Sequence, residues 1–123
     1  MSNSETMQKR ILLVIRHGNQ GDATLKEALD MAMVSAAFGQ SITLLFVEEG
    51  VYHWVKNQKT DFIGVKPYCK ALEALALYDV DQVYLCQESL LARQQSLSYD
   101  TVQSLGQSAL IDLMERSDVI IDY

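Results

Sequence analysis

The fold of this chain is decided by residues 78–91, which read YDVDQVYLCQESLL. The stretch combines the end of one helix, a short apolar strand over Gln82–Cys86 and the start of another helix. Cys86 therefore stands at the carboxyl end of a strand, where open α/β sheets place their functional groups. The first free N–H groups of the next helix favour an anion at that point. Two roles are open to Cys86: a reactive thiolate, or a small side chain packed at the strand end.

Strands and helices alternate along the rest of the chain, which indicates a parallel sheet with helices on both faces. Short continuous apolar runs are typical of strands covered on both faces. They predict strands over Arg10–Ile15, Ser41–Val47, Gln82–Cys86 and Asp118–Asp122. We therefore predict a single α/β domain over residues 1–123, three-layer α/β/α and flavodoxin-like in appearance. Its mostly parallel sheet has four to five strands, and the pattern does not locate the fifth. Residues 1–8 are predicted as a flexible N-terminus.

Three main helices are predicted between the strands. The first runs from Asp22, which can cap it, to Gly39, which ends it. A second begins at Pro67, and a last long helix begins with a capping-box pattern at Asp100 and Gln103. The first helix is expected to bury Leu25, Ala28, Leu29, Ala32, Ala36 and Ala37. The last is expected to bury Val102, Leu105, Ala109, Leu110, Leu113 and Met114.

Composition limits the class of function. The chain is 49% apolar, enough for a sizeable core, and its net charge of -6 with no basic stripe argues against direct nucleic-acid binding. No apolar run approaches the roughly 18 residues that span a bilayer, and the N-terminus lacks a signal-peptide core. The two cysteines, Cys69 and Cys86, match no zinc pattern and make no disulfide scaffold. We therefore expect a cytoplasmic protein with protein or small-molecule partners, without a metal, a cofactor or membrane contact.

Arg16-His17-Gly18 follows the first strand and resembles the start of the histidine phosphatase superfamily, in which the histidine takes a phosphoryl group. That chemistry requires a second histidine and further arginines around the phosphate. The other histidine, His53, lies in an apolar, aromatic segment instead of at a strand end. A polar turn with a solvated His17 is the favoured interpretation, and a histidine-phosphatase-like enzyme is the alternative.

The segment after the second strand begins with two acidic residues and continues with apolar ones. Glu48 and Glu49 lie at the same sheet edge as Cys86, but adjacent carboxylates usually point apart, so we expect a solvated loop. A short helix is predicted over residues 51–55. Its apolar members have two possible roles, the core or a subunit interface, where aromatic residues are enriched. These interface candidates are Val51, Tyr52, Trp54 and Val55.

The sequence resembles the TusC/DsrF family of sulfur-relay proteins over nearly the whole chain. The resemblance rests on Leu45-Phe46-Val47, Glu49-Gly50-Val51-Tyr52, Gln58-Lys59, Leu77-Tyr78-Asp79-Val80, Val83-Tyr84-Leu85-Cys86, Ser89-Leu90 and Ser117-Asp118-Val119-Ile120. Each motif is modest, but their order and spacing together are fairly specific. The TusC branch is the more similar of the two, partly because Cys86 is present.

The resemblance implies a DsrE/F-like fold and a cytoplasmic heterohexamer of the TusBCD type, with TusB-like and TusD-like subunits beside this chain. Such a complex takes persulfide sulfur from a TusA-like donor and passes it on with a TusE-like acceptor. The sulfur ends in 2-thiouridine at the tRNA wobble position. In this family the persulfide cysteine belongs to the TusD-type subunit, so the resemblance implies a structural component of a sulfurtransferase complex, not catalytic by itself. It leaves open whether Cys86 carries sulfur.

Two alternatives follow from the same residues. The first is a DsrEFH-type complex in dissimilatory sulfur oxidation, which the resemblance implies equally well at the level of fold. The second is a flavodoxin-like module that binds a small molecule.

Overall fold

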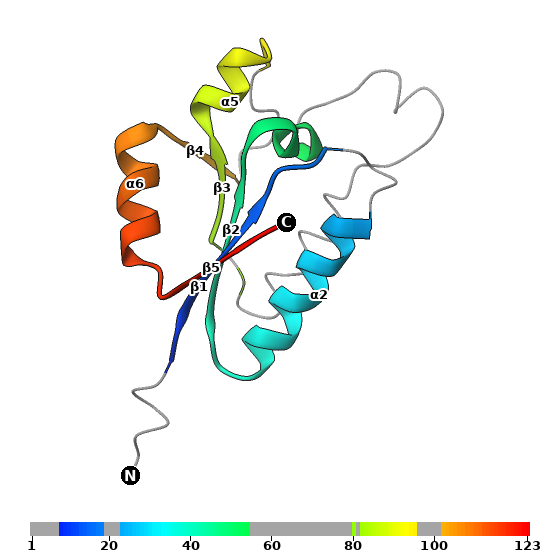
Figure 1. The fold of residues 1–123 in the computed structure, drawn as a ribbon, viewed down its shortest axis with the longest axis vertical. Helices are drawn as coiled ribbons and strands as arrows, with labels where there is room; N and C mark the ends of the chain where they lie inside the picture. The colour runs from blue at the N-terminus through cyan, green and yellow to red at the C-terminus, as the bar shows by residue number, and fades with distance from the viewer. Residues whose placement is uncertain (1–7, 19–22, 55–79, 81, 96–101) are drawn as a thin grey trace.

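A parallel sheet forms the centre of the fold (Figure 1). The computed structural model describes residues 8–18, 23–54, 80, 82–95 and 102–123. Within them the sheet has five strands in the order β4-β3-β2-β1-β5, and each neighbouring pair is parallel. The strands are β1 (Arg10–Ile15), β2 (Ser41–Phe46), β3 (Gln82–Cys86), β4 (Gln103–Leu105) and β5 (Val119–Asp122).

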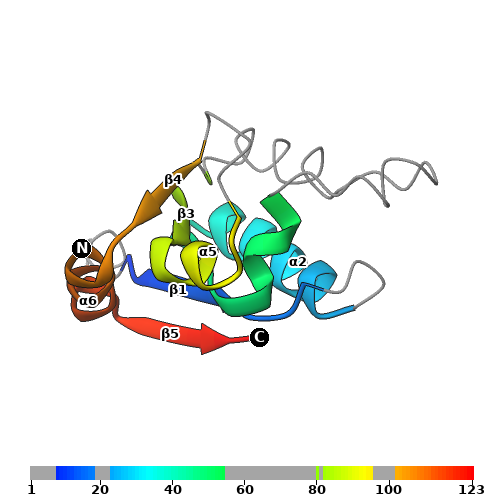
Figure 2. The same cartoon turned by 90° about the horizontal axis from the view of Figure 1, so that it is seen from above.

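Helices cover both faces of this sheet. Helix α2 (Ala23–Ala37) lies on one face and α6 (Gln107–Arg116) on the other, as Figures 1 and 2 show. The 3-10 helix η1 (Glu48–Trp54) follows β2, and the short α5 (Gln87–Ala92) follows β3. The predicted three-layer α/β/α architecture is confirmed.

Strand β1 shows how one apolar run serves two layers. Leu13 and Ile15 belong to the core under α2, whereas Leu12 and Val14 belong to the core that includes Leu113 of α6. Successive residues of a strand point to opposite faces, so a strand covered on both sides needs apolar side chains at every position. The run at Arg10–Ile15 was predicted as a strand for this reason.

Helix α2 packs against the sheet through small and medium-sized side chains. Four of its predicted core positions are buried: Leu25, Ala28, Leu29 and Ala32. Ala36 is half-buried and Ala37 is exposed, because the helix ends there. Gly39 adopts a left-handed conformation (φ 86°) and donates its N–H to Ala36 O at 2.9 Å, as a helix-ending glycine does. The predicted cap Asp22 lies outside the described residues.

The predicted start of the last helix is wrong. Gln103 was expected to complete a capping box, but Gln103–Leu105 forms strand β4, which pairs with Tyr84–Cys86 of β3. Helix α6 begins only after Gly106, its N-cap. Strand β4 is the fifth strand, which the sequence pattern did not locate. Three residues are too few to show an apolar alternation, so pairing with β3 identifies the strand.

The later start changes which side chains α6 buries. Leu113 is buried and Leu110 half-buried, while Ala109 and Met114 are exposed. Val102 and Leu105, assigned by prediction to the same helix, precede it. Burial is therefore complete or partial, as predicted, at Val102, Leu105, Leu110 and Leu113, and it is absent at Ala109 and Met114. The prediction was wrong in placing the first two of these residues in the helix.

Other predictions differ in extent from the structure. Strand β2 ends one residue before Val47, and the short helix predicted over 51–55 is η1, which starts at Glu48. Gln8, the described residue of the predicted flexible terminus, donates from its amide to Gly39 O at 2.8 Å. The helix predicted from Pro67, which includes Cys69, lies outside the described residues. Within the described part of the chain, no helix is long and apolar enough to cross a membrane.

Candidate functional site

The carboxyl ends of the strands gather the residues that the sequence singled out. Arg16 follows β1, Glu48 follows β2, Cys86 ends β3 and Asp122 ends β5. Because parallel strands end at one edge of their sheet, these residues lie along that edge, and Arg16 contacts Asp122 although 106 positions separate them along the chain. The predicted sharing of an edge by Cys86 and Glu48 is confirmed.

Cys86 has features of both roles that were open to it. It is the N-cap of α5, and its sulfur accepts a hydrogen bond from Ser89 N at 3.4 Å, so the expected contact with the first helical turn is present. Its side chain is 8% exposed and packs in the α6-side core with Leu12, Val14 and Leu45. A sulfur donor cannot approach a buried thiol without local opening. The geometry therefore favours the packing role.

Ser89 connects α5 to η1 and was not singled out in the sequence. Its hydroxyl accepts the N–H of Glu48 at 2.8 Å, while its own N–H points to Cys86. The main chain of Glu48 is left-handed (φ 51°), a conformation that is uncommon outside glycine. Ser89 therefore links the cysteine turn to a strained position beside it. No local motif announces such a contact between residues 41 positions apart.

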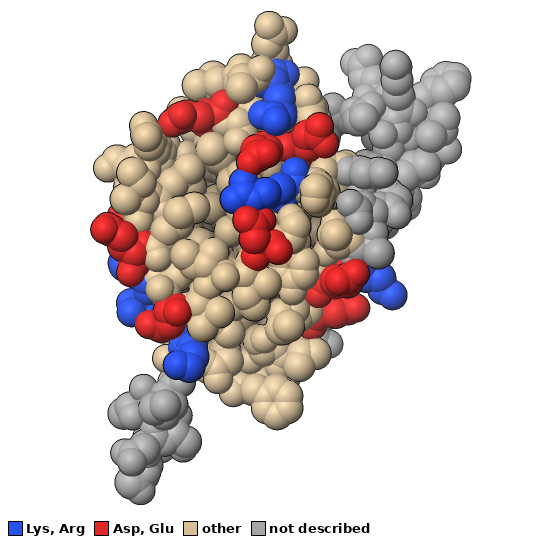
Figure 3. Space-filling view, viewed as in Figure 1, with Lys and Arg blue, Asp and Glu red and all other residues tan. Residues whose placement is uncertain are grey.

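Arg16 lies between two carboxylates. Its Nε donates to both oxygens of Asp122, at 2.7 and 2.9 Å, and its Nη1 pairs with Glu48. The hydrogen bond with Asp122 raises the pKa of the Arg16 guanidinium, which stays charged. Three strand ends are thereby connected by a half-exposed ion-pair cluster, whose individual pairs contribute little to stability, about 0–1 kcal/mol. On the face shown in Figure 3, acidic and basic side chains are likewise interleaved.

The two histidines do not form a phosphoryl-transfer pair. The side chain of His17 is exposed, as expected of a solvated turn. His53 is buried, packs edge-on against Phe46 with ring centroids 5.9 Å apart, and donates from Nε2 to the main-chain oxygen of His17 at 2.7 Å. It therefore holds the turn after β1 by its backbone. An Arg16 that already binds two carboxylates is also poorly suited to bind phosphate, since they repel an anion.

The interface candidates after Glu49 divide between core and surface. Val51 and Trp54 are buried in the α2-side core, where Trp54 packs edge-on against Phe46. Of the two roles open to them, the structure shows the core. Tyr52 is half-buried, and Val55 lies outside the described residues. Among the residues that the structure covers, no group of three or more His, Cys, Asp or Glu is placed to hold a metal ion.

With this geometry established, comparison with known proteins identifies the family. A model described as the DsrE/DsrF-like family matches residues 9–123. The chain belongs to this family. The family resemblance seen in the sequence is thereby confirmed.

Named relatives of this DsrE/DsrF-like chain span nearly its full length. Protein TusC of Klebsiella pneumoniae subsp. pneumoniae is 30% identical over 120 residues, covering 94% of this chain and 99% of the relative. The TusC homolog of Vibrio parahaemolyticus is 32% identical over 117 residues, covering 93% and 98%. The intracellular sulfur oxidation protein DsrF of Allochromatium vinosum is 28% identical over 131 residues, covering 94% and 96%.

Solved structures share the DsrE/DsrF-like fold at low sequence identity. The ychN protein from E. coli matches with a TM-score of 0.72 and 20% identity, covering 95% of this chain and all of that one. Protein MTH1491 from Methanobacterium thermoautotrophicum, titled a protein of unknown function, matches with a TM-score of 0.67 and 14% identity, covering 94% and 100%. At these identities the likeness concerns the fold alone.

Proposed function

We propose that this chain is a subunit of a cytoplasmic sulfur-relay complex of the TusBCD type, and that it builds the assembly while a sister subunit carries the persulfide. Relatives named TusC at about 30% identity support the complex. The burial of Cys86 in the α6-side core is the observation that carries the division of labour. A carrier thiol must meet a donor and an acceptor in turn, and a packed thiol does neither.

Exposed apolar side chains on the outer layers support a role as an assembly subunit. Met31 and Val34 on α2, and Phe38 just after its last residue, recur at helical spacing, and Phe38 is 79% exposed. On the opposite side, Ile111 and Met114 of α6 are exposed as well. Apolar surface of this kind marks contact sites for other proteins. A chain with such surface on two faces is suited to contact TusB-like and TusD-like subunits, and through them a TusA-like donor and a TusE-like acceptor.

The final product of the relay is proposed to be 2-thiouridine at the tRNA wobble position. The alternative is a DsrEFH-type complex in sulfur oxidation, which the relative named intracellular sulfur oxidation protein DsrF supports. Both proposals use the same fold and differ in the final sulfur acceptor. Mass spectrometry of tRNA nucleosides from a strain lacking this chain distinguishes them, since only the first predicts that 2-thiouridine disappears.

Complementation of that strain tests the division of labour. We expect Cys86→Ser to restore 2-thiouridine to at least about half of the normal level, because the sulfur only packs and accepts a weak hydrogen bond. Cys69→Ser serves as the matched control. A Cys86→Ser chain that still co-purifies with its partner subunits but restores no thiolation would show that this cysteine carries sulfur. Normal thiolation in the deletion strain itself would reject the tRNA role.

A further inference from the structure

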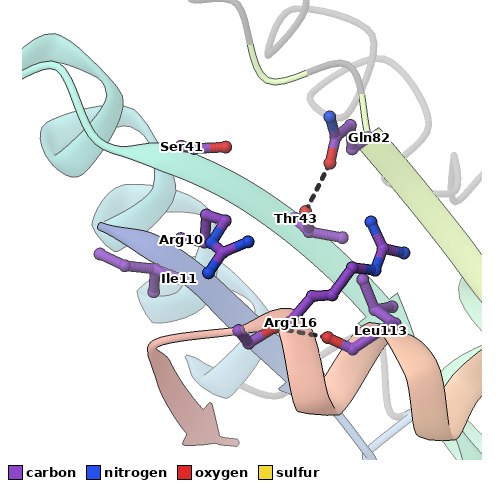
Figure 4. A pocket seen from close by; sticks show the side chains of 8 residues that line it. Arg10, Ile11, Ser41, Thr43, Gln82, Leu113 and Arg116 are labelled. Atoms are coloured by element: carbon purple, nitrogen blue, oxygen red, sulfur yellow. Dashed lines mark hydrogen bonds between the residues drawn. The ribbon is translucent and has the colours of Figure 1, made fainter. Parts of the chain in front are cut away.

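A second polar site lies at the opposite end of the sheet from Cys86. There the first residues of β1, β2 and β3 and the last turn of α6 enclose a cavity of about 120 Å³ (Figure 4). Arg10 and Arg116 line it from two sides, and Figure 4 shows their guanidinium groups on either side of Thr43. Ile11 and Leu113 supply an apolar part of its wall. This cavity shares no residue with the site described above.

Each arginine is oriented by an aspartate that occupies only one of its nitrogens. Arg10 Nε lies 3.4 Å from Asp118 Oδ2, and Arg116 Nε lies 2.9 Å from Asp112 Oδ2. Within the described residues, no acceptor receives a hydrogen bond from the Nη atoms of either arginine. A guanidinium with its Nη edge available offers a planar fork of donors that matches two oxygens of an oxyanion.

A buried hydrogen bond between strands forms part of the cavity wall. Thr43 is 7% exposed, and its hydroxyl donates to Gln82 Oε1 at 2.8 Å. The amide of Gln82 is thereby oriented with its carbonyl oxygen toward Thr43, so that its NH₂ group faces elsewhere as a donor. Ser41 contributes a further hydroxyl to the lining. The donors that remain available in the lining are those of Arg10, Arg116 and Ser41, which suits an anion.

The carbonyl end of α6, which would repel an anion, is already bonded. Ser117 donates two hydrogen bonds to this end of the helix. Its N–H donates to Met114 O at 3.2 Å, and its hydroxyl donates to Leu113 O at 2.8 Å. These bonds reduce the partial negative charge that a helix presents at its C-terminus. Arg116, in the last turn, offsets more of it. Asp118 and Asp112 offset part of the charge of the two arginines, so an anion would be held through the Nη edges that these aspartates, unlike the two carboxylates at Arg16, leave available.

We propose that this cavity binds a small oxyanion of the phosphate or sulfate class between Arg10 and Arg116. Its size decides the class, because whole cofactors and metabolites occupy pockets of about 300–1,000 Å³. A volume of about 120 Å³ accommodates one tetrahedral group. The group is either the free ion or the terminal phosphate of a larger molecule that extends into solvent. The proposal does not rest on sulfur relay.

The test is a titration of the full chain at pH 7 with inorganic phosphate, followed by backbone amide NMR, with sodium chloride at equal ionic strength as the reference. We expect saturable shifts that centre on residues 9–11, 41–43 and 116–118. Arg10→Gln and Arg116→Gln should each weaken the affinity about tenfold, because each removes a charged donor. Lys26→Gln, which removes a positive charge from the exposed side of α2, should leave the affinity unchanged.

Three outcomes decide the proposal. Saturation by both inorganic phosphate and glycerol phosphate, lost in the arginine variants, supports a site for the phosphate end of a larger molecule. Saturation by the inorganic ion alone, with the same loss, supports a free-ion site. Shifts that do not saturate, that sodium chloride reproduces, or that persist in both variants would overturn it. The amide spectra report directly whether each variant is folded, so a misfolded variant cannot be mistaken for a loss of binding.

Discussion

Among single residues, Gly50 shows how closely η1 approaches the end of β1. A Cβ atom at this position would overlap the main-chain carbonyl of Ile15, and one at Gly18 would overlap that of Glu49. Backbone atoms cannot move aside as the end of a side chain can. The two glycines therefore permit the close contact that brings Glu48 to Arg16.

We expect Gly50→Ala to destabilise the chain by about 3 kcal/mol, because overpacking against backbone strains both segments. Gly106→Ala is the matched control. Its Cβ would lie 3.3 Å from Gln87 Oε1, the movable end of a side chain, so the loss there should stay below about 1 kcal/mol. Urea denaturation followed by circular dichroism measures both. Equal losses in the two variants would contradict the steric explanation.

Cys86 illustrates what a residue's position in the sequence predicts and what it does not. Its place at a strand end, facing the N–H groups of α5, was predicted and is confirmed by the Ser89 contact. The burial of the Cys86 side chain was left undecided, because it depends on packing with α6. Leu113 of that helix belongs to the same core as Cys86. The side chains that cover Cys86 come from other strands and from a helix more than 20 residues away along the chain.

Among the elements, β5 is aligned with β1 at its start by a side chain as well as by the backbone ladder. Asp118, just before the strand, accepts the N–H of Arg10 at 2.8 Å, and Asp118 N donates to Arg10 O at 2.8 Å. The backbone hydrogen bond from Arg10 is the main cause that lowers the pKa of Asp118 below its ordinary value, and the Arg10 side chain adds to it. The charged carboxylate thus holds the starts of β1 and β5 side by side.

We expect Asp118→Asn to lower the stability of the chain at pH 7, with a difference from the wild type that depends on pH. A carboxylate whose pKa is lowered by folding stabilises the folded state above its unfolded pKa, near 3.8, and loses this contribution as the pH falls through the lower folded value. The difference in urea midpoint should therefore be constant from pH 7 to about 5 and shrink in more acidic buffer. A difference that grows on acidification would contradict this linkage.

The elements were predictable to different degrees. Strands β1, β2, β3 and β5 and helix α2 follow from local runs and periodicities, so they were predicted within a residue or two of their observed ends. Strand β4 was missed because three residues carry no period, and because its first residue, Gln103, matched a helix start together with Asp100 by chance. The predicted helix start was therefore several residues too early, and Val102 and Leu105 were assigned to a helix that they precede.

At the scale of the whole molecule, both helical layers carry exposed apolar side chains. Met31 and Val34 of α2 and Phe38, just after its end, are exposed on the outer side of that layer, away from the sheet. Of the interface candidates Val51, Tyr52, Trp54 and Val55, the structure places Val51 and Trp54 in the core and leaves Tyr52 half-buried. Exposed apolar side chains of the described residues lie instead on layers that include α2 and α6.

We expect the isolated chain to self-associate through α2 in the absence of its partners, and Phe38→Glu to shift it toward monomer. Phe38 is mostly exposed, so the substitution should cost little folding stability while it places a charge in the contact. Lys26→Ala changes the net charge by the same amount on the same helix and should have no effect. Sedimentation velocity over a hundredfold concentration range measures the association. A wild-type chain that stays monomeric throughout would rule out the α2 contact.

Local patterns in the sequence predicted the alternation of strands and helices, the parallel sheet and the placement of Glu48 and Cys86 at one edge of it. These features depend on local apolar periodicity and on the rule that parallel strands end together. The tertiary structure alone decided that Cys86 is covered, that Arg16 binds Asp122, and that Arg10 and Arg116 share a cavity. Each of these depends on atoms brought together from distant parts of the chain, and no local pattern encodes such a distance.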